Sequence, residues 1–188
     1  MTQHALHRHL GVDRPLHRSI ERAHGRELTE PQLQELVREL AFHQDWWQHL
    51  VRHDPAQRRY QELSRDDDVS VWLICWSEVQ DTGFHEHDHS PGAVAVVAGQ
   101  VCEERLTLGG RSRTRIATAG ESFTFAAADV YRISNAPGEP AVTIHAHSPP
   151  LRRIGAYDLL PDGGLRRHSM FRRRRAPSGL RALLREPA

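Results

Sequence analysis

Three histidines at alternate positions, in the stretch GFHEHDHSPG (residues 83–92), constrain this chain more than any other feature. Alternate side chains of an extended strand point to the same face of a sheet. His85 and His87 are therefore expected to converge, with His89 at the rim of the same face. Converging neutral imidazoles bind first-row transition metals, so the spacing predicts a metal site. The alternative interpretation is a histidine-rich surface turn, because the chain contains 14 histidines.

A short apolar run follows the histidines and favours the metal site. Pro91 and Gly92 form a turn signal. The next six residues, AVAVVA (93–98), are small or β-branched and are followed by Gly99, which predicts a buried strand. A buried strand directly after the histidines is not typical of a solvated surface turn.

Composition limits the class of protein. The 188 residues are enough for one domain with a sizeable core, and no stretch approaches the ~20 apolar residues of a membrane span. The net charge of +1 gives no general attraction to nucleic acid or membranes. Cys75 and Cys102 are expected as free thiols in a reducing compartment. Since the first residues also lack the order of a secretory signal, we expect a cytoplasmic protein.

Residues 1–53 are expected to form a helical cover, and residues 171–188 a solvated basic tail. Residues 16–23 have apolar positions at roughly helical spacing. A second helix should begin at residues 29–31, where a threonine can cap it and a proline suits the first turn. Its apolar positions follow the i, i+3, i+4, i+7 rule and are Leu33, Leu36, Val37, Leu40 and Ala41. The tryptophans at 46–47 are expected in a core.

Residues 54–170 are expected to form a β-barrel. Between residues 69 and 150, short runs are separated by Gly and Pro turns with no helical pattern between them, which is typical of a sandwich or barrel. The expected strands are 69–76, 84–89, 93–97, 100–108, 111–117, 121–125, 130–134 and 141–147. Before them we expect a polar link over 57–63 and an acidic turn over 66–68. One more strand or hairpin is expected after residue 150.

The histidine stretch and the strand after it resemble the first motif of the cupins, small β-barrel proteins that hold a metal. In that motif His-x-His is followed by a Glu, whose position is occupied by Gly92, and then by a Gly, here Gly99. The frame of the second cupin motif matches Gly120 and Asn135, but Tyr131 occupies its histidine position. The resemblance implies an all-β double-stranded β-helix, or jelly-roll barrel, with N-terminal helices.

Three segments, CWSEVQDTGFHEHDHSPG, YRISN and EPAVTIHAHSPPL, are together similar to the cysteine dioxygenase branch of the cupins. The similarity spans residues 55–160 and implies a ferrous ion held by three histidines, with open positions for a thiol and O2. His85 and His87 match the first two ligands. His145 matches a histidine that supports a catalytic tyrosine, and His147 stands where that tyrosine belongs.

Histidine and tyrosine are therefore exchanged between two positions of the family pattern, because Tyr131 stands where the third ligand belongs. The third ligand is then His147, a Tyr131 phenolate or water. We favour His147, since imidazole suits Fe, Ni, Cu and Zn alike, and assign catalytic roles to Tyr131 and His145. Gly92 occupies the position of a cysteine that cross-links to the tyrosine in animal members, so that cross-link cannot form here.

The family also binds the substrate carboxylate through an arginine just before the first strand, and an arginine fork suits a carboxylate. Counting without gaps places Arg59 there, whereas a shorter linker would place Glu62 there. The predicted site is thus His85, His87 and His147 for the metal, Tyr131 and His145 for catalysis, and Arg59 for substrate binding.

The resemblance implies a metal-dependent oxygenase that uses O2 to oxidise the sulfur of L-cysteine or a related small thiol. The expected metal is Fe(II), with Ni or another first-row metal as the alternative. The product is a sulfinate or, because the histidine and tyrosine are exchanged, a more deeply oxidised or rearranged product such as a sulfonamide. The alternative function is a non-catalytic metal- or thiol-binding cupin that acts as a sensor or accessory protein.

Overall fold

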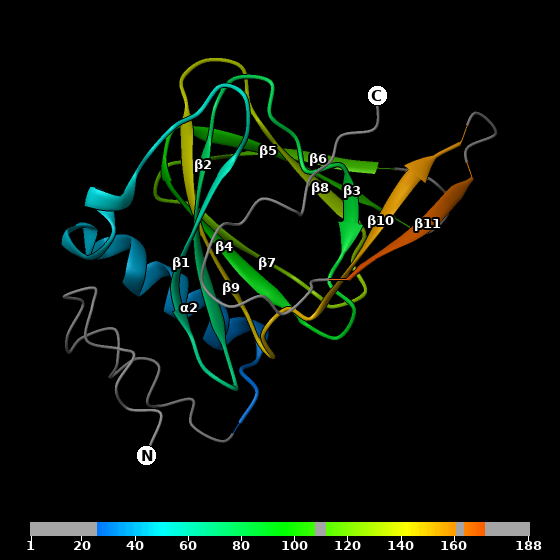
Figure 1. Cartoon of the computed structure of the whole chain (residues 1–188), viewed down its shortest axis with the longest axis horizontal. Helices are drawn as coiled ribbons and strands as arrows, with labels where there is room; N and C mark the ends of the chain where they lie inside the picture. Colours follow the sequence, from blue (N-terminus) through cyan, green and yellow to red (C-terminus); the bar gives the residue numbers. More distant parts are fainter. Residues whose placement is uncertain (1–25, 108–111, 161–163, 172–188) are drawn as a thin grey trace.

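The computed structural model describes residues 26–107, 112–160 and 164–171 (Figure 1). Its helices are α2 (Glu30–Phe42) and the 3-10 turns η3 (Gln44–Trp46) and η4 (Gln48–Leu50). Its strands are β1 (Arg59–Arg65), β2 (Ser70–Trp76), β3 (Phe84–Glu86), β4 (Gly92–Ala98), β5 (Gln100–Leu106), β6 (Ser112–Thr118), β7 (Ser122–Phe125), β8 (Tyr131–Asn135), β9 (Ala141–His147), β10 (Arg153–Leu159) and β11 (Leu165–Phe171). The helix expected at 16–23 and the arginines at 172–175 lie outside the described residues.

The strands form two antiparallel sheets, which confirms the predicted all-β core. The strand orders are β1-β2-β9-β4-β7 and β11-β10-β3-β8-β5-β6. Helix α2 contacts β4, β7 and β9, so it covers the outer face of the first sheet (Figure 1). The β10–β11 hairpin extends from the edge of the second sheet, which it joins through β3.

Helix α2 forms where the sequence predicts it. The Thr29 backbone N–H donates to Gln32 Oε1 at 2.9 Å, which satisfies one of the free amides at the helix start. The buried face consists of Leu33, Leu36, Val37 and Leu40. Trp46 and Trp47 are buried in the same cluster, as predicted for core residues. These side chains pack between the helix and the sheet and form the outer of two cores.

Strand β2 separates the two cores, and all seven of its residues are buried. Val71, Leu73 and Cys75 belong to the outer core beneath α2. Trp72, Ile74 and Trp76 belong to the inner core between the sheets. Alternation along an extended chain produces this division, because successive side chains point to opposite faces.

Two local predictions need correction. The expected polar link over 57–63 is largely strand β1, which pairs antiparallel with β2 and has only one neighbour in the sheet. The polar sequence of β1 gave no strand signal, because an edge strand keeps partly exposed side chains. The expected strand over 84–89 ends at Glu86, and Asp88 has a φ of 56°. The hairpin expected after residue 150 is confirmed as β10–β11.

Cys75 and Cys102 are free, as predicted. Across the described residues, no helix has both the length and the apolar character needed to cross a membrane.

Candidate metal centre

The sheet ladders bring the predicted metal-binding and catalytic residues to the interior between the sheets. His85 on β3 lies directly opposite Tyr131 on β8. Gly92 on β4 lies opposite His147 on β9 and Phe125 on β7. The ring centroid of His87 lies 4.9 Å from that of His85 and 4.7 Å from that of His147. The exposed His89 does not share this environment, because its side chain is 89% exposed.

His85 is held in a state that suits a metal ligand. Its Nδ1 lies 3.0 Å from the carbonyl oxygen of Gly83. A carbonyl only accepts, so Nδ1 carries the proton and donates to it. Burial lowers the pKa of His85, with a further contribution from Arg58. The neutral ring then keeps its lone pair on Nε2, and a hydrogen bond at the other nitrogen is the usual support for a ligating histidine.

His87 lies at the centre of the histidine group. Burial holds its pKa well below the ordinary value, and the neighbouring His147, His85 and His145 act in the same direction. Its Nδ1 is buried and has no hydrogen-bond partner within the described part of the chain. Leaving a buried polar atom unpaired is costly. A neutral imidazole held in this way is suited to bind an ion.

His145 is fixed by a chain of side-chain contacts. Its Nε2 lies 2.9 Å from Thr143 Oγ1, which accepts a hydrogen bond from Trp76 Nε1 at 2.8 Å. Burial lowers the pKa of His145 to about 3, aided by His85 and Arg58. Its ring centroid lies 6.3 Å from that of His147. The structure therefore places a neutral, oriented imidazole beside His147.

Tyr131 is almost fully buried, and its hydroxyl has no hydrogen-bond partner among the described residues. Its ring centroid lies 4.8 Å from that of His85 and 5.6 Å from that of His87. Burial raises the pKa of Tyr131 well above its ordinary value, and Glu103 raises it further. Without an ion, the group is therefore a neutral hydroxyl rather than a phenolate.

Phe125 fills the space next to Gly92. A Cβ at position 92 would lie 2.2 Å from Phe125 Cζ and 2.8 Å from the Ala146 carbonyl oxygen. The Phe125 ring centroid lies 4.6 Å from that of Tyr131 and 4.9 Å from that of His87. Gly92 thus admits an aromatic ring that forms an apolar wall of the site. Sequence reasoning missed Phe125, because an apolar side chain in a strand gives no chemical signal.

These side chains are of the types that bind first-row ions, but the described residues do not form a ready-made three-ligand site. In the regions that the structure describes, no three His, Cys, Asp or Glu side chains are arranged so that they can hold a metal ion. His85 keeps a lone pair on Nε2, and His87 is a neutral imidazole whose Nδ1 has no hydrogen-bond partner among the described residues. The Tyr131 hydroxyl belongs to a different ligand type. Two imidazoles next to a buried phenol and His147 are therefore the candidate metal centre.

The two arginines before and at the start of β1 lie on opposite faces. Arg58 is only 9% exposed, and its Nε donates to the Tyr60 hydroxyl at 2.7 Å. Its guanidinium lies 5.4 Å from the Trp76 ring centroid in the inner core. Its Nη1 is buried without a hydrogen-bond partner from the described residues. Arg59, the residue predicted for substrate binding, is instead 53% exposed and pairs with Asp54 at 2.6 Å.

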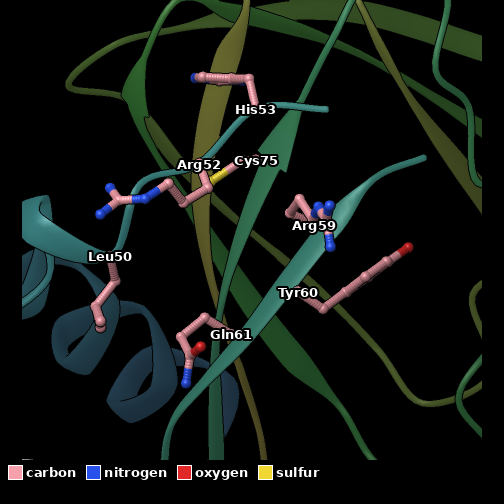
Figure 2. Close-up of a pocket in the computed structure, with 7 residues that line it drawn as sticks. All are labelled: Leu50, Arg52, His53, Arg59, Tyr60, Gln61 and Cys75. Carbon is pink, nitrogen blue, oxygen red and sulfur yellow. The ribbon is translucent and has the colours of Figure 1, made fainter. Parts of the chain in front are cut away.

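A pocket of about 410 Å³ lies beside Arg59, on the outer face of β1 (Figure 2). It is lined by Leu50, Arg52, His53, Arg59, Tyr60, Gln61 and Cys75. Tyr60 and Gln61 point to opposite sides of the strand, as Figure 2 shows. The histidine group does not line this pocket. Glu62, the other residue considered for the carboxylate, contacts Arg65 at 3.5 Å.

Sequence reasoning missed Arg58 because β1 was not recognised as a strand. A shift of one residue moves a side chain to the other face of a sheet. The signal was present in the pattern Arg58-x-Tyr60, which places a cation and an aromatic ring on one face.

Solved structures resemble the chain at low sequence identity. A protein from Thermus thermophilus matches with a TM-score of 0.50 and 16% identity, covering 55% of this chain and 93% of that one. A Klebsiella pneumoniae protein described by its double-stranded β-helix domain has a TM-score of 0.49 and 17% identity, covering 54% and 80%. A cupin superfamily protein from Desulfitobacterium hafniense has a TM-score of 0.47 and 10% identity, covering 54% and 86%. No curated protein matches the sequence.

Two antiparallel sheets around a histidine-lined interior define the class of fold, an all-β two-sheet domain. Residues 25–159 match the family model of cysteine dioxygenase type I. The chain belongs to the cysteine dioxygenase type I family.

Proposed function

We propose that this chain is a metal-dependent oxygenase that uses O2 to oxidise the sulfur of L-cysteine or a related small thiol. Membership of the cysteine dioxygenase type I family supports thiol dioxygenase chemistry. The observation that carries the proposal is the buried pair His85 and His87, both kept neutral beside Tyr131 and His147. The product is a sulfinate or, because the family's histidine and tyrosine are exchanged, a deeper oxidation or rearrangement product such as a sulfonamide.

His85, His87 and His147 are the proposed metal ligands, for Fe(II) or another first-row ion such as Ni. Because the described structure does not hold these three rings in a metal-binding arrangement, the proposal requires them to reorient when the ion binds. When bound, such an ion supplies open positions at which thiolate sulfur and O2 are held together. His147 is favoured because the raised pKa of Tyr131 opposes a phenolate ligand. The unpaired Tyr131 hydroxyl supports the opposite assignment, in which an ion displaces its proton.

Tyr131 is proposed to hold or donate a proton at its hydroxyl oxygen. It is buried next to His85, and its raised pKa keeps that proton in place at neutral pH. His145 is a positioning residue, fixed through Thr143 and Trp76, that faces His147. Phe125 excludes water from the side of the site formed by β4 and β7.

Arg58, rather than Arg59, is proposed to bind the substrate carboxylate. The Arg58 guanidinium is buried over Trp76, and its charge acts on both His85 and His145. Its Nη1 lacks a hydrogen-bond partner in the described structure, so a donor is available for a carboxylate oxygen. Tyr60 holds the guanidinium through Nε. Because a buried unpaired cation is costly, an incoming carboxylate gains more there than at the surface.

Oxygen uptake tests the proposed activity. Protein loaded with Fe(II), and separately with Ni(II), is mixed with L-cysteine, and the product is identified by mass spectrometry. Thiol-dependent O2 consumption with an oxidised sulfur product is expected, and the His85→Ala variant should lack it. Tight cysteine or metal binding with unchanged cysteine would instead support the non-catalytic cupin and contradict the oxygenase.

The third ligand is tested by a pair of substitutions. If His147 is the ligand, His147→Gln should lose most of the bound metal, whereas Tyr131→Phe should retain it and lose turnover. If a Tyr131 phenolate is the ligand, Tyr131→Phe should lose most of the bound metal and His147→Gln should retain it. The phenolate-to-metal absorption band should then be absent from Tyr131→Phe. Elemental analysis and absorption spectra of both purified variants distinguish the two sets.

A further inference from the structure

The strand that carries His85 and leads directly into His87 has little support from the barrel itself. β3 contains three residues, and its ladder with β8 consists of the single pair His85 and Tyr131. Its ladder with β10 is longer and pairs all three residues, from Phe84 to Glu86. β10 is in turn paired with β11 from Arg153 to Leu159. Most of the sheet support for β3 therefore comes from a hairpin at the edge of the sheet (Figure 1).

Glu86, between the two histidines, ties β3 to the far strand of that hairpin. Its side chain is 8% exposed, and Arg167 on β11 reaches Glu86 Oε1 with Nη2 at 2.5 Å and Nε at 3.0 Å. The other carboxylate oxygen accepts a hydrogen bond from the Asp88 backbone N–H. One carboxylate thus fixes the chain on both sides of His87, and a charged two-point contact of this kind is strong and directional.

Gly155 makes the contact geometrically possible. It lies on β10, between β3 and β11, directly opposite Glu86. A Cβ at Gly155 would lie 2.0 Å from Glu86 Oε1 and 2.8 Å from Arg167 Nε. The ion pair therefore passes over β10 through the space that a side chain would occupy. This is a close approach that glycine allows.

We propose that the β10–β11 hairpin is a clamp that positions the metal-binding strand, acting through Arg167, Gly155 and Glu86. Alternation along β3 directs Glu86 to the face opposite His85, where it pairs with Arg167, so Glu86 is a positioning residue and not a ligand. The clamp acts on a strand that the barrel holds at one residue pair. This inference rests on the proposed function in that it takes His85 and His87 as metal ligands.

Three variants test the clamp against a matched control. Arg167→Gln removes the charge, Arg167→Lys keeps the charge but not the fork, and Gly155→Ala keeps both charges but displaces the contact. The control is Arg166→Gln, because Arg166 is on the same strand, is 63% exposed and pairs within the hairpin, with Asp158 at 3.1 Å. Circular dichroism checks that each variant remains folded.

The first measurement is amide hydrogen exchange of residues 85–88 in metal-free protein, which does not depend on ligand assignment. Arg167→Gln and Gly155→Ala should accelerate exchange there at least ~10-fold, Arg167→Lys by less, and Arg166→Gln should match wild type, since weakly held segments open locally. The second measurement is metal affinity by competition with a chelator. Substituting a residue that orients a metal ligand usually lowers the metal affinity ~10–100-fold, and a loss of that size is expected for Arg167→Gln.

Unchanged exchange at residues 85–88 in both Arg167→Gln and Gly155→Ala would overturn the clamp. Faster exchange with unchanged metal affinity would overturn its positioning role. If His87→Ala retains its metal, the proposed function fails, and the exchange measurement on metal-free protein still decides whether the hairpin holds the strand.

Discussion

At the start of strand β1, two adjacent arginines lie in opposite physical states. On the inner side, Arg58 is buried over Trp76, and its Nη1 has no hydrogen-bond partner among the described residues. On the outer face, Arg59 is largely exposed, pairs with Asp54 and lines an open pocket (Figure 2). The residues are adjacent in sequence and chemically identical. Burial, together with the absence of a competing carboxylate among the described residues, therefore decides which cation can serve a substrate, rather than residue type.

The same contrast holds within the histidine stretch. His85 and His87 are buried with lowered pKa values, whereas His89 is exposed beside Asp88. An exposed imidazole is hydrated and screened, and it gains little from its neighbours. His85 and His87 are shielded from water by burial, so binding an ion or a substrate offsets the cost of burying their polar atoms. Matched substitutions on the two faces can break or sharpen this distinction.

The largest effect is expected for His87→Ala compared with His89→Ala. Loss of a proposed ligand should weaken metal binding more than ~100-fold, beyond the 10–100-fold typical of residues that only orient ligands. The His89 variant should bind metal like wild type. Elemental analysis after gel filtration, together with chelator competition, measures both. Equal metal content in the two variants would remove the distinction between the inner and outer histidines.

The next effect is expected for Arg58→Gln compared with Arg59→Gln. Removing one member of a buried charge pair typically costs ~2–5 kcal/mol, so kcat/KM for cysteine should fall on the order of 100-fold in the Arg58 variant. The Arg59 variant should change it less than ~2-fold. Cysteamine lacks the carboxylate, so its kcat/KM should be nearly the same in both variants. A larger loss from Arg59→Gln would assign the carboxylate to the outer face.

Thermal unfolding of the same pair adds a second criterion. Arg58 is a buried cation without full hydrogen bonding, so Arg58→Gln should be at least as stable as wild type. A variant that gains stability and loses activity identifies a residue kept for function. A marked loss of stability would instead make Arg58 a structural residue.

The fold was predictable because its signals are local and repeated. The apolar run at 93–98, the capped helix at 29–31 and the short alternating strands each form elements near the expected residues. The histidines could be chosen by spacing, because alternate positions share a face. Strand β1 could not be predicted from its sequence, because it lies at the edge of its sheet and its side chains are largely polar. Without that strand, the direction of the Arg58 side chain could not be assigned, because a shift of one residue moves a side chain to the other face.

The contacts around the site were less accessible to prediction, because they join residues far apart in sequence. Glu86 contacts Arg167 across β10, which pairs with β3, so the contact depends on the order of strands in the sheet. Phe125 reaches Gly92 only because β7 pairs with β4. Neither Phe125 nor Gly155 has a chemical signature, and the space that each fills or leaves is a property of the packed chain.

The smallest of these effects, and the most direct test of close packing on the inner face, is expected for Gly92→Ala. Its Cβ would collide with Phe125 and approach the Ala146 carbonyl oxygen, so ring and backbone must both shift. Overpacking typically costs ~1–3 kcal/mol, which should lower the melting temperature by roughly 2–10 °C in a domain of this size. Gln61→Ala, in the open outer pocket, should shift it by less than about 2 °C. Combining Gly92→Ala with Phe125→Leu should recover part of the loss, because the smaller side chain yields space. If the double variant is as unstable as the sum of the single variants, Phe125 is not the partner that Gly92 accommodates.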